Sequence, residues 1–121
     1  MKRDLNLVRA ILLDIEAAPA GGPITRFHYE GKEKAEILEH IQLLLDAGLV
    51  EGEVRLDHRN CPNACLVYRM TWNGQEFVAR AKNDTLWKKV LAQAEEKGLS
   101  TSMAVINGLL EAAAKKYVGL E

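Results

Sequence analysis

Residues 40–50 read HIQLLLDAGLV, and the architecture of the chain can be worked out from this segment. Ile41 is followed three and four residues later by Leu44 and Leu45, so these side chains can pack on one side of a helix. Gly48 can adopt the left-handed backbone conformation that ends a helix. The apolar pair Leu49 and Val50 then favours an extended chain. The segment therefore predicts a helix that leads directly into a strand.

The sequence before this segment predicts three elements and a loop. Asp4 can cap a first helix over residues 4–17, whose apolar positions step by 3, 4 and 3. The prolines and glycines of residues 18–23 break that helix and predict a loop. β-branched and aromatic side chains then predict a strand over residues 24–30. A second helix, over residues 32–47, completes this part.

The sequence after the segment predicts a hairpin. Two strands, over residues 49–57 and 65–71, flank a polar tip at residues 58–64. Because side chains alternate along a strand, three residues of the second strand are expected to share one face. They are Leu66, Tyr68 and Met70.

Three more helices are predicted after the hairpin. The Thr71 hydroxyl can cap the third helix, and Asn83 lies where a break or a new cap begins the fourth, which ends near Gly98. Ser100 can cap the last helix. The two tryptophans are predicted to anchor the core. They are Trp72 and Trp87.

Composition limits the possible functions. The chain has 121 residues, with 16 basic and 17 acidic side chains and a formal net charge of −1. An apolar fraction of 48% and a charged fraction of 27% indicate a globular domain and exclude a disordered chain. With so little net charge, binding to nucleic acid would need a local basic patch. We expect no membrane segment, and two cysteines are too few for a secreted disulfide framework, so we expect a cytoplasmic protein.

Two segments resemble winged-helix proteins. HIQLLLDAGLV resembles the end of a recognition helix that enters the first wing strand, and MTWNGQEF, residues 70–77, resembles the step from the second wing strand to the next helix. With MKRDL at residues 1–5 and NDTLW at residues 83–87, the chain is similar to an uncharacterised phage- and prophage-associated bacterial family of unknown function. The resemblance implies a mobile-element context and an α+β, mainly α fold. That fold is a winged-helix-like domain with a two- or three-stranded antiparallel wing and additional C-terminal helices.

The resemblance implies a domain organisation, and the sequence departs from the usual winged helix in one respect. We expect a winged-helix-like domain over residues 1–98 and a C-terminal helix within residues 99–121, packed on that domain and on a dimer partner. A helix-turn-helix needs two helices joined by a tight turn. Only one helix is evident before Gly48, so the first helix of the motif is missing, shortened or hidden within residues 32–36.

The fold analogy favours a DNA-binding transcriptional regulator that binds double-stranded DNA. The candidate phosphate contacts are Arg26, Lys32, Lys34, Arg55, Arg59 and Arg69. Against this, the helix over residues 32–47 carries two basic and four acidic residues. Glu36, Glu39, His40 and Leu43 are expected on its outer face, which disfavours base readout through this helix. The alternative function is a protein-interaction module whose acidic helix docks on a basic host or phage protein.

The last helix has a broad apolar arc, which predicts a homodimer interface. The residues of that arc are Met103, Ile106, Leu109, Leu110, Ala113 and Tyr117.

Catalytic and metal chemistry find little support in the sequence. No nucleophile elbow, phosphate-binding loop, dinucleotide fingerprint or zinc-protease motif occurs, so we expect no enzyme activity and no cofactor. His58, Cys61 and Cys65 have the pattern H-x2-C-x3-C, which can supply three zinc ligands, with His28 or His40 as a fourth. The favoured interpretation is two unpaired thiols and no metal site, and a disulfide between them is a further alternative.

Overall fold

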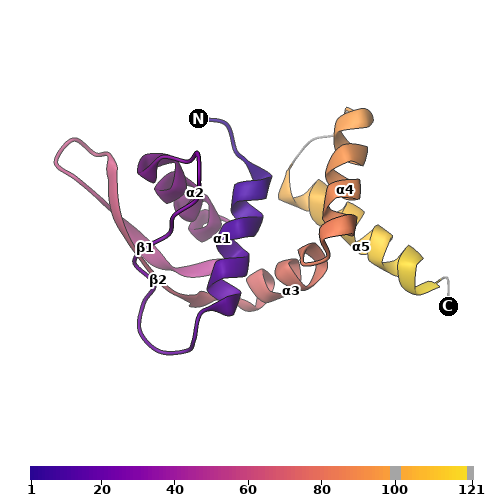
Figure 1. The fold of residues 1–121 in the computed structure, drawn as a ribbon, viewed down its shortest axis with the longest axis horizontal. Helices are drawn as coiled ribbons and strands as arrows, with labels where there is room; N and C mark the ends of the chain where they lie inside the picture. Colours follow the sequence, from indigo (N-terminus) through magenta and orange to yellow (C-terminus); the bar gives the residue numbers. More distant parts are fainter. Residues whose placement is uncertain (99–101, 120–121) are drawn as a thin grey trace. The chain divides into compact units, whose positions relative to one another are not determined.

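The computed structural model describes residues 1–98 and 102–119, with side chains for all of them except residues 103 and 116–119. The described chain is α+β and mainly helical, with a two-stranded antiparallel sheet (Figure 1). It forms two compact units, Met1–Gln75 and Glu76–Glu121. The domain limits expected from the sequence, at residue 98, stay a prediction. The elements are α1 (Leu5–Ala17), α2 (Lys34–Asp46), β1 (Val50–Leu56), β2 (Pro62–Met70), α3 (Trp72–Ala81), α4 (Asp84–Glu96) and α5 (Met103–Gly119).

The core of the first unit lies between two helices and the hairpin. α1 packs on α2 and on β2, and α2 packs on both strands. Ile11 and Leu12 of α1, Ile41 of α2 and Val67 of β2 are completely buried. The helix that ends at Gly48 and the hairpin that follows it therefore share one apolar centre with α1.

The end of α2 follows the prediction closely. Gly48 has a φ of 72°, in the left-handed region. Its N–H donates to the Leu45 carbonyl at 3.1 Å, and the Leu49 N–H donates to the Leu44 carbonyl at 3.0 Å. These two hydrogen bonds form a Schellman motif, which stops the helix and turns the chain into β1.

The residues before α2 differ from the prediction. The expected strand over residues 24–30 is reduced to one bridge, in which Ile24 and Val67 exchange backbone hydrogen bonds of 2.9 and 3.0 Å. The chain then leaves the sheet, because the Tyr29 hydroxyl donates to Asp14 on α1 at 2.5 Å. Residues 25–33 contain no helix, so the first helix of a helix-turn-helix is not hidden there.

The hairpin pairs Val50 with Met70 but contains an irregularity that changes which side chains face inward. Glu51 pairs with Arg69 and Gly52 with Val67, which leaves Tyr68 as an extra, bulged residue. Tyr68 is exposed as a result. The prediction that Leu66, Tyr68 and Met70 share one face is therefore wrong. The buried residues of β2 are Cys65, Val67 and Met70.

The turn of the hairpin is shorter than expected and is tied together by one carboxylate. It occupies residues 57–61, because β2 already begins at Pro62. Asp57 Oδ1 accepts hydrogen bonds from the backbone N–H groups of Arg59 and Cys61, at 2.8 and 3.0 Å. Asn60 has a φ of 62°, a left-handed conformation that asparagine tolerates in turns.

Three predicted helix caps are confirmed. Asp4 Oδ1 accepts from the N–H groups of Asn6 and Leu7, at 3.0 and 3.2 Å. The Thr71 hydroxyl oxygen accepts from the Gly74 N–H at 3.1 Å and the hydroxyl donates to the Gly48 carbonyl, which ties the start of α3 to the end of α2. Asn83 Oδ1 accepts from the Leu86 N–H at 3.0 Å, so that Asn83 begins α4. The predicted cap Ser100 lies outside the described residues.

The second unit has its own apolar centre. Trp87 of α4 is buried and meets Phe77 of α3 edge to face, with ring centroids 6.1 Å apart. α4 also packs on α5. The prediction that both tryptophans anchor the core is correct for Trp87 and wrong for Trp72, which is 77% exposed at the first position of α3.

The arc proposed as a dimer interface is partly covered by the chain itself. Ile106 and Leu110 are buried, at 0% and 1% exposure, and Leu109 and Ala113 are half-buried. The side chains of Met103 and Tyr117 lie outside the described residues. A partner subunit would therefore have to contact Leu109 and Ala113, and the dimer stays a prediction.

Candidate functional site

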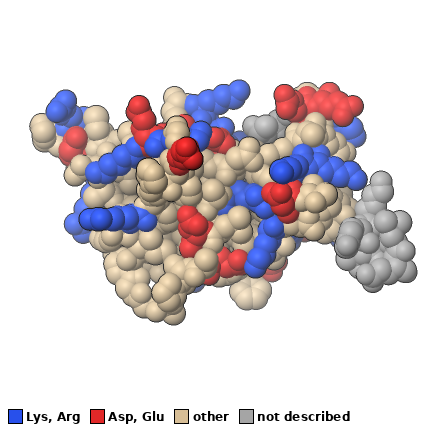
Figure 2. Space-filling model, viewed as in Figure 1, with Lys and Arg blue, Asp and Glu red and all other residues tan. Residues whose placement is uncertain are grey.

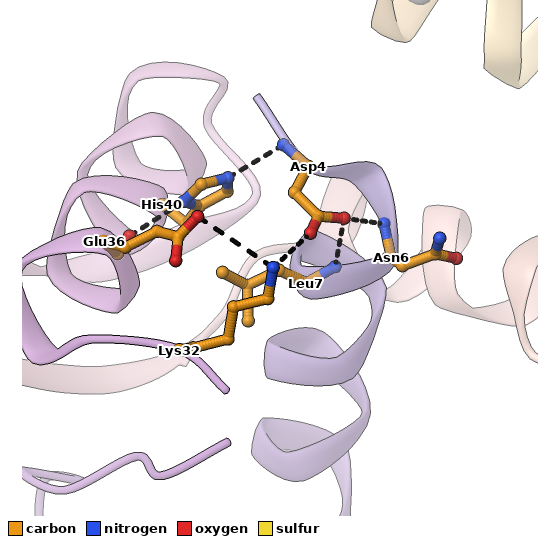
Figure 3. Close-up of polar contacts among 6 residues, drawn as sticks. All are labelled: Asp4, Asn6, Leu7, Lys32, Glu36 and His40. Atoms are coloured by element: carbon orange, nitrogen blue, oxygen red, sulfur yellow. Dashed lines mark hydrogen bonds and ion pairs between the residues drawn. The ribbon is translucent and has the colours of Figure 1, made fainter. Parts of the chain in front are cut away.

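A polar cluster joins the start of α1 to α2 (Figure 3). Asp4 Oδ2 lies 2.8 Å from Lys32 Nζ, in an ion pair that adds to the capping bonds of the same carboxylate. Lys32 also lies 3.9 Å from Glu36 Oε2. The hydrogen bond from Lys32 is the largest influence on the Asp4 carboxyl, whose pKa is lowered below its ordinary value. Asp4 in turn raises the pKa of Lys32.

His40 forms the buried side of this cluster. Its side chain is completely buried, and Nε2 accepts a hydrogen bond from the backbone N–H of Asp4 at 2.9 Å. Nδ1 lies 2.8 Å from the Glu36 carbonyl oxygen, which can only accept. These partners assign the proton to Nδ1 and use both ring nitrogens. The expectation that His40 lies on the outer face of its helix is wrong, because the ring links two helices.

The irregular segment before α2 is held at three points. Ile24 is paired with β2, Tyr29 is bonded to Asp14 on α1, and Lys32 is bonded to Asp4. Burial and the neighbouring Asp14 raise the pKa of the Tyr29 hydroxyl, which therefore stays a hydrogen-bond donor. The segment is fixed to the core even though it belongs to neither helix nor strand.

This anchored segment forms one wall of a pocket of about 420 Å³. The first turns of α2 form a second wall and residues 63–65 of β2 a third. Three basic side chains line it, and no carboxylate does so among the described residues. These basic residues are Arg26, Lys32 and Lys34.

The basic side chains of the pocket differ in how far their charge is neutralised. Lys32 is paired with Asp4, whereas Arg26 and Lys34 form no ion pair with any residue that the structure describes. Both are exposed. The N-cap residue of α2, Glu33, supplies no side-chain hydrogen bond to the helix. Two uncompensated cations therefore face a concave surface beside the positive end of a helix.

Six cations were predicted to contact phosphates, and the structure brings three of them together. Arg69 is bonded to both carboxylate oxygens of Glu51, at 2.8 and 3.1 Å, and Arg55 lies 3.4 Å from Glu53. Arg59 is exposed at the hairpin tip. Figure 2 shows basic side chains on the hairpin side of the first unit, interspersed with acidic ones. The two paired hairpin arginines offer little free charge to a ligand.

Other residues of the pocket were not found by sequence reasoning as parts of one site. Phe27, Ile37 and Leu38 line it, together with His28, which the sequence suggested only as a metal ligand. They come from separate segments and share no motif. The one available signal was the pair of cations at Lys32 and Lys34, just before an apolar helix.

The cysteines form two free thiols. Cys61 is exposed at the hairpin tip, whereas Cys65 is buried and lines the pocket, and burial raises the pKa of the Cys65 thiol. Across residues 1–98 and 102–119, no three His, Cys, Asp or Glu side chains lie where they could hold a metal ion together. His40 is committed to its hydrogen bonds and is not a spare ligand.

The comparisons with known proteins identify a family. No described helix has the length and apolarity needed to cross a membrane. No solved structure matches the chain. An uncharacterised protein of Haemophilus influenzae is 32% identical over 108 residues, which cover 88% of this chain and 89% of that protein. The family described as "Hypothetical protein (DUF2513)" matches residues 2–100, and the chain belongs to this family.

Proposed function

We propose that the protein is a non-enzymatic, winged-helix-like module that binds double-stranded DNA through the phosphate backbone. Arg26 and Lys34 provide the main contacts, Lys32 beside them contributes less because Asp4 pairs with it, and Arg59 at the hairpin tip provides an outer contact. In this proposal the protein acts as a transcriptional regulator of mobile-element origin. The convergence of three basic side chains on one pocket, with no carboxylate among the described residues that line it, is the observation that supports it.

The order of the elements supports the winged-helix comparison. α2 leads through Gly48 into a two-stranded hairpin, and β2 leads into α3. Ile24 pairs with β2, as a third strand of a wing would. Recognition helices present their first residues to DNA, and Lys34 is the first residue of α2.

The charge of α2 argues for backbone contacts over base readout. Glu36 and Glu39 are half-buried on α2, and Asp46 is exposed near its end. Carboxylates close to phosphates are repelled, so the helix is expected to approach DNA through Lys34 at its start, where Glu36 of the same turn is paired with Lys32. Binding should therefore depend weakly on base sequence and strongly on salt.

The proposal is tested by titrating duplex DNA at several salt concentrations. The slope of log K against log salt is about −0.9 for each phosphate neutralised. Replacing Arg26 and Lys34 together by alanine should reduce the magnitude of this slope by about 1.8. Arg69→Ala is the matched control, because Arg69 is already neutralised by Glu51, and it should leave the slope unchanged. Absence of binding even at low salt would remove the proposal.

A second candidate function is a protein-interaction module that docks on a basic protein. Glu33 is exposed and Glu39 is half-buried, and neither forms an ion pair within the described chain. If this function holds, affinity capture from a host lysate should enrich a single basic protein in place of nucleic acid. Replacing Glu33 and Glu39 together by glutamine should abolish that capture.

The homodimer belongs to the proposal as well, because a dimer can place two copies on neighbouring sites of a duplex. Leu109 is only half-buried within the chain, so Leu109→Glu should yield a soluble monomer without disturbing the buried Ile106. Light scattering measures the mass. A wild-type protein that is already monomeric would exclude this part of the proposal.

A further inference from the structure

The basic pocket has the size of a small-molecule site. Its volume of about 420 Å³ lies within the range of about 300–1,000 Å³ found for ligand pockets. A duplex backbone that rests on the exposed cations would not fill a pocket of this volume. The interior of the pocket is therefore available to a second kind of ligand.

The pocket has an apolar wall and a positively charged wall. Ile37 and Leu38 are buried and form an apolar wall, together with the half-buried ring of Phe27. Arg26 and Lys34 are exposed and bear the free charges. A ligand that matches both parts has a negative group at one end and an apolar or planar body at the other.

We propose that this pocket binds a small organic anion, with its carboxylate or phosphate held by Arg26 and Lys34 and its body packed against Phe27, Ile37 and Leu38. The guanidinium of Arg26 can hold either group through two parallel hydrogen bonds. Lys32 contributes less, because Asp4 already neutralises it.

The bound anion also regulates the surface around the pocket. It occupies Arg26 and Lys34, two of the cations that were assigned to the DNA backbone, so ligand and duplex compete. This second part rests on the proposed function, whereas binding of the anion itself does not.

The ligand class is tested with three probes on the wild-type protein, by calorimetry and by amide chemical shifts. Adenosine monophosphate has a phosphate and a planar body, 2-naphthoate has a carboxylate and a planar body, and inorganic phosphate has no body. One or both organic anions should bind about tenfold or more tightly than inorganic phosphate, with shifts at Ile37 and Leu38. Equal binding of all three, or no binding of the organic anions, overturns the proposal.

Two sets of variants place the ligand. Arg26→Ala and Lys34→Ala should each weaken the organic anion about tenfold, and Arg69→Ala should not. Ala64 is exposed at the rim of the pocket on β2, so Ala64→Trp should fill the pocket and abolish anion binding while the DNA salt slope is retained. Far-UV circular dichroism checks that this variant is folded. Should it not fold, the wild-type shifts at Ile37 and Leu38 decide, since ligand bound elsewhere leaves them unmoved.

The outcomes separate the two proposals. Organic-anion binding without any DNA binding keeps this inference and removes the proposed function. DNA binding without organic-anion binding does the reverse. If both bind, the organic anion should lower the apparent affinity for duplex DNA, and failure to compete would overturn the regulatory part.

Discussion

Two polar clusters meet at Lys32 and differ in how completely their groups are paired. On one side Asp4 and His40 form a cluster in which the carboxylate and both ring nitrogens have partners. On the other side Arg26 and Lys34 face the pocket with no ion pair inside the described chain. Saturated clusters fix the positions of helices, whereas unpaired charges in a concave site remain available to a ligand. The difference suggests a structural role for the first cluster and a binding role for the second.

The strongest test of the structural cluster is the substitution His40→Ala. It removes the acceptor of the Asp4 N–H and opens a cavity, so it is expected to lower the free energy of unfolding by about 3 kcal/mol. Urea denaturation measures this change. His28→Ala is the matched control, because His28 is exposed, and it should change stability by no more than about 0.5 kcal/mol. Equal effects of the two substitutions would contradict the structural role of His40.

Two substitutions of Asp4 separate the contributions that its helix cap and its ion pair make to stability. Asp4→Ala removes both and should cost about 1 kcal/mol from the cap alone. Asp4→Asn keeps a capping oxygen and removes only the charge, so its loss of stability should be smaller. Asp4→Asn also frees Lys32, so duplex DNA should bind more tightly than to the wild type. Equal losses in the two variants would show that the cap contributes nothing.

Acid should reveal the ionic part of the cluster. The pKa of Asp4 is lowered below its ordinary value of 3.8 in the folded protein. The unfolded chain therefore binds more protons at acidic pH, and the stabilisation is complete above the unfolded pKa and lost as the pH falls through the folded pKa. The stability difference between wild type and Asp4→Asn should stay constant from neutral pH down to about pH 5 and shrink below it. A difference that grows at acidic pH would reverse the assignment.

The smallest effect is expected on the hairpin. Glu51→Gln frees Arg69 from its bidentate partner and adds one cation near the proposed DNA surface. The salt slope of DNA binding should become steeper by less than about 0.9, the value for one full phosphate contact. An effect larger than that of removing Arg26 and Lys34 would place the main contact on the hairpin, and the comparison between the two clusters would no longer hold.

Local patterns in the sequence predicted most of the fold. The caps at Asp4, Thr71 and Asn83 and the left-handed end at Gly48 were found because each depends on a few adjacent residues. The bulge at Tyr68 was missed, because its register is set by the partner strand and one extra residue reverses the inward and outward faces.

The candidate site was harder to predict than the fold. Arg26, Lys32 and Lys34 were among the predicted cations, but so were Arg55 and Arg69, which differ only in having carboxylates opposite or beside them. Their pairing depends on strand register and side-chain conformation. The segment over residues 24–30 was expected to be a strand because of its β-branched and aromatic residues. A tertiary bond from Tyr29 to α1 overrides that preference and bends the segment into a pocket wall.

The turn at Asp57 affects how tightly the hairpin could bind another molecule. Two backbone N–H groups are bound to that carboxylate, so the loop that carries Arg59 is folded before any encounter. A guanidinium carried by an ordered turn loses less conformational entropy on binding than one carried by a flexible segment. The free energy of binding is then not reduced by the cost of ordering the loop.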